Sequence, residues 1–285
     1  MKYIIVKFNI PTGELRQTAS ELLADSMGEI GFEAFEDTED GINGYIQEDM
    51  FHDEIVSQQI AQLPFEGIHI TYTAEKAEDK NWNQEWEEQG FDPICVDGKI
   101  TIYDAKHTAE TPQLTDLEIG IEPVQAFGSG THQTTQMIVS QLLALDLSQK
   151  RVLDCGCGTG ILGIVAAKLG VHEVIGYDID EWSVENSEHN ARLNNVENLT
   201  VLLGNSSVLS HVCGVFDVVM ANINRNILLD DMHNFKDVMG SNAKLILSGF
   251  YTEDAESLIQ KATDNGLELL STTTKDNWCC LVFGN

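Results

Sequence analysis

A glycine-rich segment, Val152-Leu-Asp-Cys-Gly-Cys-Gly-Thr-Gly-Ile-Leu-Gly163, carries the clearest chemical signal in the sequence. We expect a buried strand to enter this turn and a helix to leave it. Glycines let the backbone approach a ligand that side chains would exclude, and the amino end of the helix offers N–H groups. The segment therefore predicts a nucleotide-binding site.

Two classes of nucleotide fit this turn. Gly158, Gly160 and Gly163 have the spacing of a dinucleotide fingerprint. Asp154, followed by Gly156, Gly158 and Gly160, has the pattern of S-adenosylmethionine-dependent methyltransferases. The carboxylate of Asp154 would repel a pyrophosphate but attract the ammonium of a methionine moiety, directly or through water. The aspartate therefore favours the methyl donor over an NAD-dependent oxidoreductase.

Other polar residues end predicted strands, where ligands bind in open parallel sheets. Asp178 can accept hydrogen bonds from both ribose hydroxyls of either cofactor, whereas Asp180 is expected to cap the next helix. The side-chain carbonyl of Asn222 can hold an amine nucleophile, unless Asn222 only caps the helix that follows. No Pro-Pro-aromatic sequence follows Asn222, which counts against a flat nucleobase as substrate.

A second glycine-rich segment, Ala-Phe-Gly-Ser-Gly-Thr-His-Gln-Thr-Thr at 126–135, precedes a predicted helix. Its two glycines and three threonines indicate a lid or wall over a ligand, although alone they would indicate only a loop and a helix start. We interpret His132 as a structural residue rather than a general base.

The elements that position these residues alternate regularly after residue 131. Strands are predicted at 151–154, 173–178, 199–203, 215–221, 243–249, 266–273 and 277–283, and helices at 131–146, 160–169, 181–194, 225–238 and 253–264. Buried strands separated by helices predict a doubly wound, mostly parallel sheet, and the last two strands should form an antiparallel hairpin.

The amino-terminal part is built differently. Strands are predicted at 3–9, 32–36, 43–48 and 67–74, and helices at 13–30 and 50–63. This β-α-β-β-α-β order predicts a ferredoxin-like domain. Residues 77–90 are charged and carry Trp82 and Trp86 on one helical face, as a packed linker would, and 91–124 should form short strands with a turn at Asp97-Gly98.

The charge and composition of the chain restrict the classes of partner that it is expected to bind. The 285-residue chain has 46 acidic and 16 basic residues, a formal net charge of −30. Bare nucleic acid and anionic membranes would be repelled, and a basic protein would be attracted. The six cysteines have no zinc-site spacing, so we expect no metal. Without an apolar run long enough for a membrane span or a signal peptide, a cytoplasmic protein is expected.

These segments together resemble the PrmA family, the methyltransferases of ribosomal protein L11. The resemblance is carried by residues 126–135, by Leu-Asp-Cys-Gly-Cys-Gly-Thr-Gly-Ile-Leu from Leu153, by Asp-Ile-Asp at 178–180 and by Ala-Asn-Ile at 221–223. It covers roughly 77–285 by motif, and 1–76 only by expected topology. Ser129 in place of the usual threonine, and Asn224-Arg225 after the motif asparagine, are small departures.

The resemblance implies a Rossmann-like, doubly wound, mostly parallel seven-stranded methyltransferase sheet with a small N-terminal α+β ferredoxin-like domain. The expected divisions are a substrate-recognition domain at 1–76, a helical linker at 77–92 and an S-adenosylmethionine-dependent methyltransferase domain at 93–285. The implied reaction moves methyl groups from S-adenosylmethionine to lysine side chains and the amino-terminal amine of a basic ribosomal protein, free or on the ribosome.

The motifs and the resemblance together give the expected site. The cofactor-binding residues are Phe127, Gly128, Thr135, Asp154, Gly156, Gly158, Asp178 and Asn222, with Asn222 also catalytic. We expect a monomer that does not bind nucleic acid directly. The main alternative is a methyltransferase acting on a nucleobase or a glutamine amide, and a non-enzymatic binding module is a weaker one.

Overall fold

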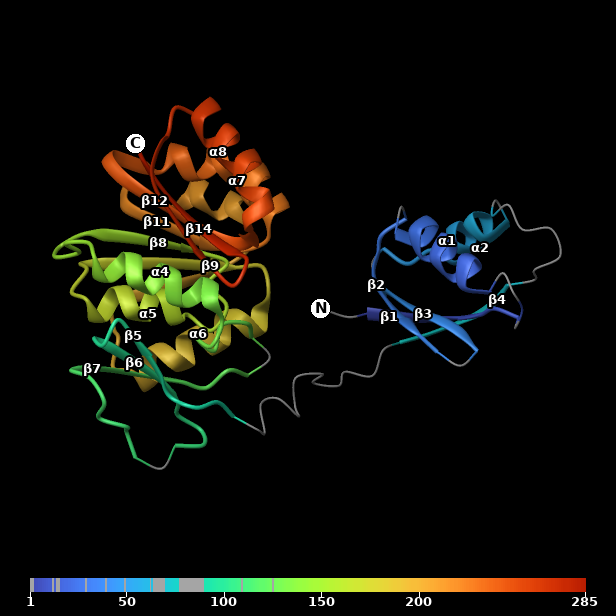
Figure 1. Ribbon diagram of the computed structural model, residues 1–285, viewed down its shortest axis with the longest axis horizontal. Helices are drawn as coiled ribbons and strands as arrows, with labels where there is room; N and C mark the ends of the chain where they lie inside the picture. Colours follow the sequence, from blue (N-terminus) through green and yellow to red (C-terminus); the bar gives the residue numbers. More distant parts are fainter. Residues whose placement is uncertain are drawn as a thin grey trace. The chain divides into compact units, whose positions relative to one another are not determined.

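The computed structural model describes residues 3–11, 13, 16–28, 30–38, 40–48, 50–61, 63, 70–76, 90–108, 110–124 and 126–285 of the chain (Figure 1). The chain divides into two compact units, Met1–Trp82 and Asn83–Asn285. The helical linker expected at 77–92, with both its tryptophans, falls outside the described residues except at 90–92. The domain limits expected from the sequence therefore stay predictions.

The first unit is a four-stranded antiparallel sheet with two helices. Its elements are β1 (Tyr3–Asn9), α1 (Arg16–Gly28), β2 (Phe32–Asp37), β3 (Gly41–Gln47), α2 (Asp53–Ala61) and β4 (Thr71–Lys76), and the strand order is β2-β3-β1-β4. Alternate residues of β1, such as Val6 and Phe8, are buried in a core that they share with Leu23 and Met27 of α1. The ferredoxin-like assignment stays a prediction.

The second unit contains the seven-stranded sheet that the sequence predicts, and its mostly parallel α/β character is confirmed. The strands are β8 (Arg151–Cys155), β9 (Glu173–Asp178), β10 (Leu199–Leu203), β11 (Phe216–Asn222), β12 (Met239–Tyr251), β13 (Glu268–Lys275) and β14 (Trp278–Gly284). Their order is β10-β9-β8-β11-β12-β14-β13. β14 runs antiparallel to both of its neighbours, β12 and β13, and all other neighbouring strands in this sheet are parallel. β8 and β11 flank the point where the strand order reverses. Ligands bind beyond the carboxyl ends of strands at such a point.

Helices cover both faces of this sheet. The helices are α4 (Gln133–Leu143), α5 (Ile161–Lys168), α6 (Glu181–Leu193), α7 (Arg225–Asp237) and α8 (Ala255–Asp264). Alternate residues of β8 enter different cores: Val152 packs with α4 and α5, and Leu153 packs with α7 and α8. Burial on both faces explains why these strands are continuous apolar runs in the sequence.

A second, three-stranded sheet precedes α4. It consists of β5 (Ile94–Val96), β6 (Ile100–Asp104) and β7 (Leu117–Ile121) in the order β5-β6-β7, so β7 is an edge strand. Ile102 and Ile119 are buried in the same core as α4 and α5. The short strands expected at 91–124 are therefore part of the second unit.

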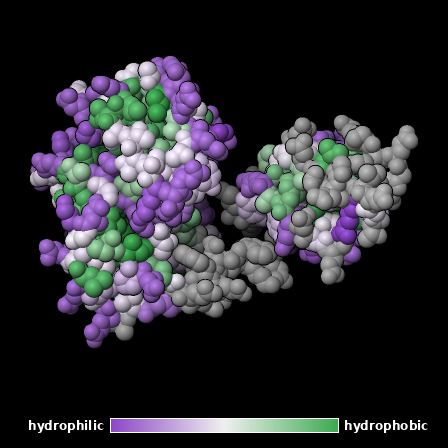
Figure 2. Space-filling model, viewed as in Figure 1, coloured by the Kyte–Doolittle hydropathy of each residue, from purple (hydrophilic) through white to green (hydrophobic). Residues whose placement is uncertain are grey.

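The visible surface of the second unit is largely hydrophilic (Figure 2). Strongly hydrophilic side chains cover much of the visible face, with apolar patches between them (Figure 2). In the part of the chain that the structure describes, no helix is long and apolar enough to cross a membrane.

Candidate functional site

A cavity of about 730 Å³ opens at the carboxyl ends of β8, β9 and β11. Its volume lies in the range of small-molecule sites. The lining comes from seven segments: Phe127, His132, Thr134, Gly156, Gly158, Tyr177, Asp178, Ile179, Ser183, Asn205, Ser206, Asn222, Ile223, Asn224, Ile227, Asp230, Asp231, Gly249 and Trp278. Among these described lining residues three are aspartates and none is lysine or arginine, so the cavity suits a cationic ligand.

The glycine-rich turn is shaped by close contacts that exclude side chains. Gly156 and Gly158 have φ of +67° and +54°. A Cβ on Gly158 would lie 2.2 Å from the carbonyl oxygen of Phe127, and one on Gly156 would lie 2.4 Å from Cγ2 of Ile223. Glycine is required at both positions because neighbouring segments close directly on the turn.

The N–H groups of the turn are already used inside the protein. Gly156 and Cys157 donate to the carbonyl of Tyr177, Gly158 donates to Asp178, and Gly160 donates to the carbonyl of Cys157. Thr159 N–H donates to the carbonyl of Phe127. The N–H groups of residues 156–160 are therefore used within the protein. The N–H groups expected at the amino end of the helix are a separate set, because α5 begins only at Ile161. A pyrophosphate held by the N–H groups of the turn itself is disfavoured by this geometry.

Asp178 stands at the end of β9 and lines the cavity. Its Oδ2 accepts from Gly158 N–H at 2.9 Å, and its Oδ1 accepts from Asp180 N–H at 3.1 Å. A carboxylate has about four acceptor sites, so each oxygen keeps one for a ligand. Asp180 occupies the N-cap position of α6 as expected, but its side chain makes no capping hydrogen bond.

Asp154 lies beneath the turn rather than in the cavity wall. It is 1% exposed, and its Oδ2 accepts from Gly163 N–H at 2.9 Å. Its Oδ1 is buried and has no hydrogen-bond partner among the described residues. Burial raises the pKa of this carboxyl to about 7. Because the carboxyl does not line the cavity, a cationic ligand there would contact the unpartnered Oδ1 through a water molecule. A buried acceptor without a partner is consistent with such a contact.

This pKa predicts a pH dependence of stability. The folded protein keeps the Asp154 proton up to about pH 7, whereas the unfolded chain releases it near its usual pKa. The folded state therefore binds more protons between about pH 4 and 7, and its stability falls as the pH rises through that window. Asp154→Asn should remove this component, which integrates to roughly 4 kcal/mol.

Urea unfolding of the parent and of Asp154→Asn at pH 5 and pH 8 measures the difference. All other titrating groups cancel in the comparison, so the variant should gain stability over the parent as the pH rises. Parallel pH profiles for the two proteins would mean that the pKa of Asp154 is not raised.

Asn222 ends β11 and lines the cavity. Its Nδ2 donates to Oγ1 of Thr135 at 3.3 Å, and no hydrogen bond to its Oδ1 forms within the described ranges. The helix α7 is instead capped by Asn224, whose Oδ1 accepts from Ile227 N–H at 3.1 Å. The alternative in which Asn222 only caps this helix is therefore wrong. Thr135 is fully buried and reaches the site through Asn222 rather than by lining it.

The segment before α4 forms a wall of the cavity. Phe127 lines it with a 69% exposed side chain. Oγ1 of Thr159 donates to the carbonyl of Gly128 at 2.6 Å, and Gly128 has φ of +111°. Together with the bond from Thr159 N–H to Phe127, this fastens the wall to the glycine-rich turn.

His132 is the N-cap of α4. Its Nδ1 accepts from Thr134 N–H, and burial lowers its pKa, so the ring is neutral at pH 7. Its ring centroid lies 4.6 Å from that of Trp278. The structural role expected for His132 is therefore a helix cap, although the ring also lines the cavity.

Trp278 is the largest lining residue that the sequence reasoning missed. It begins β14, and its ring centroid lies 4.2 Å from that of Tyr251. Because β14 is antiparallel to β12, its first residue lies at the edge where the parallel strands end. The hairpin predicted at the end of the chain already implied this position for Trp278. The second strand of a hairpin starts at the edge of the sheet where the first strand ends.

The remaining missed residues come mainly from loops and α7. Asn205 and Ser206 follow β10, Ile223 follows Asn222, and Asp230 and Asp231 come from α7. Across the described ranges, no cluster of three or more His, Cys, Asp or Glu residues could hold a metal ion.

Comparisons with known proteins agree on one family. The family model "Ribosomal protein L11 methyltransferase (PrmA)" matches residues 18–285. Proteins named ribosomal protein L11 methyltransferase are 42% identical in Phocaeicola vulgatus and 40% identical in Bacteroides thetaiotaomicron, each over 283 residues and 99% of both chains. A crystal structure of ribosomal protein L11 methylase from Lactobacillus delbrueckii subsp. bulgaricus matches with a TM-score of 0.62 and 27% identity. It covers 68% of this chain and 98% of that one.

Proposed function

The chain belongs to the PrmA family of ribosomal protein L11 methyltransferases, and from this we propose that it methylates amino groups of ribosomal protein L11. It is an enzyme, and its methyl donor is S-adenosylmethionine. The acceptors in this proposal are lysine side chains and the amino-terminal α-amine. The observation that carries it is the position of Asn222 and Asp178 in one cavity with no lysine or arginine among its described lining residues.

The residues at the cavity fit this donor. S-adenosylmethionine supplies an electrophilic methyl group attached to a positively charged sulfur. Three aspartates in the lining favour that charge, and the N–H groups of residues 156–160, being used within the protein, are not available to a pyrophosphate. We propose that the donor is held by Phe127, Gly128, Thr135, Asp154, Gly156, Gly158, Asp178 and Asn222. In this group Thr135 acts through Asn222, and Asp154 acts from beneath the turn.

Asn222 has the geometry to aim an amine. Because its Nδ2 is committed to Thr135, its Oδ1 is the side-chain atom that can accept an N–H from the acceptor. Holding one N–H points the nitrogen lone pair at the methyl carbon, as in-line displacement requires. Phe127, Ile223 and Trp278 line the same cavity with apolar surface, which favours displacement of water when the donor and the acceptor are bound.

The acceptor amine must lose a proton before it attacks. A lysine has a pKa of about 10.4, so roughly one in a thousand is neutral near pH 7.4, which costs about 4 kcal/mol. His132 is not placed to take this proton with Nδ1, since that atom already accepts from Thr134. We propose that solvent removes it as the amine enters the cavity.

The net charge of −30 supports a basic protein as substrate, because it attracts cations over distance. We further propose that a domain at residues 1–76 recognises the substrate, that the enzyme is a cytoplasmic monomer, and that it does not bind nucleic acid directly. A nucleobase or a glutamine amide is the second candidate substrate. Trp278 in the cavity favours it, because an indole can stack on a flat group.

Methyl transfer from labelled S-adenosylmethionine tests the proposal. The purified enzyme is incubated with a lysate of cells that lack its gene, and labelled species are resolved by mass. Label confined to ribosomal protein L11, on lysine and the amino terminus, is the expected result. Label in RNA or on glutamine would overturn the acceptor but keep the donor. An enzyme that binds S-adenosylmethionine and labels nothing would overturn the proposed reaction.

A further inference from the structure

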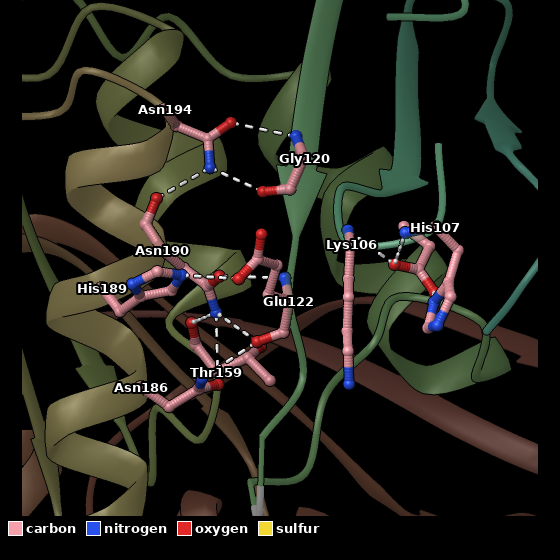
Figure 3. A network of polar contacts seen from close by, with 10 residues as sticks. Lys106, His107, Gly120, Glu122, Thr159, Asn186, His189, Asn190 and Asn194 are labelled. Atoms are coloured by element: carbon pink, nitrogen blue, oxygen red, sulfur yellow. Dashed lines mark hydrogen bonds and ion pairs between the residues drawn. The ribbon is translucent and has the colours of Figure 1, made fainter. Parts of the chain in front are cut away.

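Helix α6 and its C-cap residue carry three buried asparagines, four residues apart, on the face turned toward β7 (Figure 3). Asn186, Asn190 and Asn194 are 5%, 0% and 7% exposed. Four helical residues rise about 6 Å, and two strand residues span about 6.8 Å. Asparagines with this spacing can therefore pair with alternate residues of a strand that runs beside the helix.

The asparagines supply hydrogen bonds that a further strand would otherwise make to the edge of β7. Asn194 accepts from Gly120 N–H at 3.0 Å and donates to its carbonyl at 2.7 Å. Asn190 accepts from Glu122 N–H at 3.0 Å, and Asn186 donates to the carbonyl of Glu122 at 2.9 Å. These pairs satisfy backbone groups that would otherwise be buried and unpaired.

Asn190 differs from Asn194 in a second set of contacts. Its Nδ2 also donates to the carbonyl of Thr159 at 3.0 Å, within the glycine-rich turn (Figure 3). Thr159 in turn holds Phe127 and Gly128 through its own N–H and hydroxyl. In the described chain, Asn194 bonds only Gly120 and its own helix.

The side chain of Asn190 therefore bonds two points that hold the wall segment, residues 126–135, in place. Glu122, which lies four residues before the wall segment begins at Ala126, and Thr159 of the turn, which holds Phe127 and Gly128, both bond the amide of Asn190. We propose that Asn190 is a positioning residue for the cofactor site: it sets the distance between the Phe127 wall and the glycine-rich turn. This inference rests on the site assigned to S-adenosylmethionine under the proposed function, but not on the identity of the methyl acceptor.

The test compares Asn190→Leu with Asn194→Leu in the full-length enzyme. Both changes keep the branching and the number of heavy atoms of the side chain and remove a buried amide that bonds the backbone at or just after β7, so both should lower the melting temperature. Calorimetry with S-adenosylmethionine should give a Kd at least tenfold weaker for Asn190→Leu and within about threefold of the parent for Asn194→Leu. Hydrogen exchange should be faster at the Thr159 amide only in Asn190→Leu.

Equal weakening of cofactor binding in the two variants, or none in Asn190→Leu, would overturn the positioning role. Should Asn190→Leu not fold, Asn190→Ser and Asn194→Ser make the same comparison without adding bulk at the buried sites. Because the readout is cofactor binding, it is independent of acceptor identity. A wrong acceptor would leave the contrast intact, whereas an incorrect role for Asn190 would remove it.

Discussion

Asn222→Ala is expected to lower the rate of methyl transfer roughly 100-fold and to weaken the Kd for S-adenosylmethionine by a smaller factor, about tenfold at most. The asparagine holds the acceptor nitrogen, and this contact matters most when the amine attacks. Its bond to Thr135 fixes the side chain before the substrate arrives, so the contribution is pre-organised. Single-turnover rates at saturating donor, together with calorimetry, separate the two quantities.

Asn224→Ala is the matched control. It removes the cap of α7 two residues away and should cost about 1 kcal/mol of stability without slowing transfer. If Asn222→Ala weakened donor binding as much as it slowed transfer, the residue would only hold the donor. If Asn224→Ala slowed transfer equally, the loss in both variants would come from the shared loop.

The alternating part of the fold could be predicted because local and tertiary preferences agree there. The strand predicted at 215–221 is apolar on both faces from Val218 to Ala221, as a central parallel strand must be, and β11 spans Phe216–Asn222. The strand predicted at 243–249 is longer in the structure, Met239–Tyr251. Gly240 and Asn242 weaken the local signal, but pairing with β11 and β14 extends the strand at both ends.

The site could be predicted where residues adjacent in sequence are adjacent in space. Asp178 and Asn222 end their strands as expected. What could not be predicted depends on contacts between distant segments. The use of the turn N–H groups requires the carbonyls of Phe127 and Tyr177, and Trp278 enters only because β14 inserts between β12 and β13.

Asn186, Asn190 and Asn194 show the same limit. Their spacing is visible in the sequence, and it places them on one face of a helix. Polar residues on a helix usually indicate a solvated face. In the structure this face is buried instead, because the asparagine amides form hydrogen bonds with backbone groups at and just after the edge strand β7.

Gly158→Ala is expected to weaken S-adenosylmethionine binding by tenfold or more, equivalent to at least about 1.4 kcal/mol. The new Cβ would lie 2.2 Å from the carbonyl oxygen of Phe127. That oxygen also accepts from Thr159 N–H, so the wall cannot move away without breaking the bond. The φ of +54° adds strain of its own, on the order of 1 kcal/mol. Calorimetry and thermal unfolding measure the two effects separately.

Gly170→Ala is the control that separates the effect of backbone strain from the effect of a steric clash of the new Cβ. Gly170 also has a positive φ, +93°, but a Cβ there meets no heavy atom within 4 Å. This control should lose about 1 kcal/mol of stability and bind the donor as the parent does. Equal losses of affinity in the two variants would mean that strain alone weakens binding. A larger loss in Gly158→Ala is the expected result, because only at Gly158 does the new Cβ meet the Phe127 wall at the edge of the cavity.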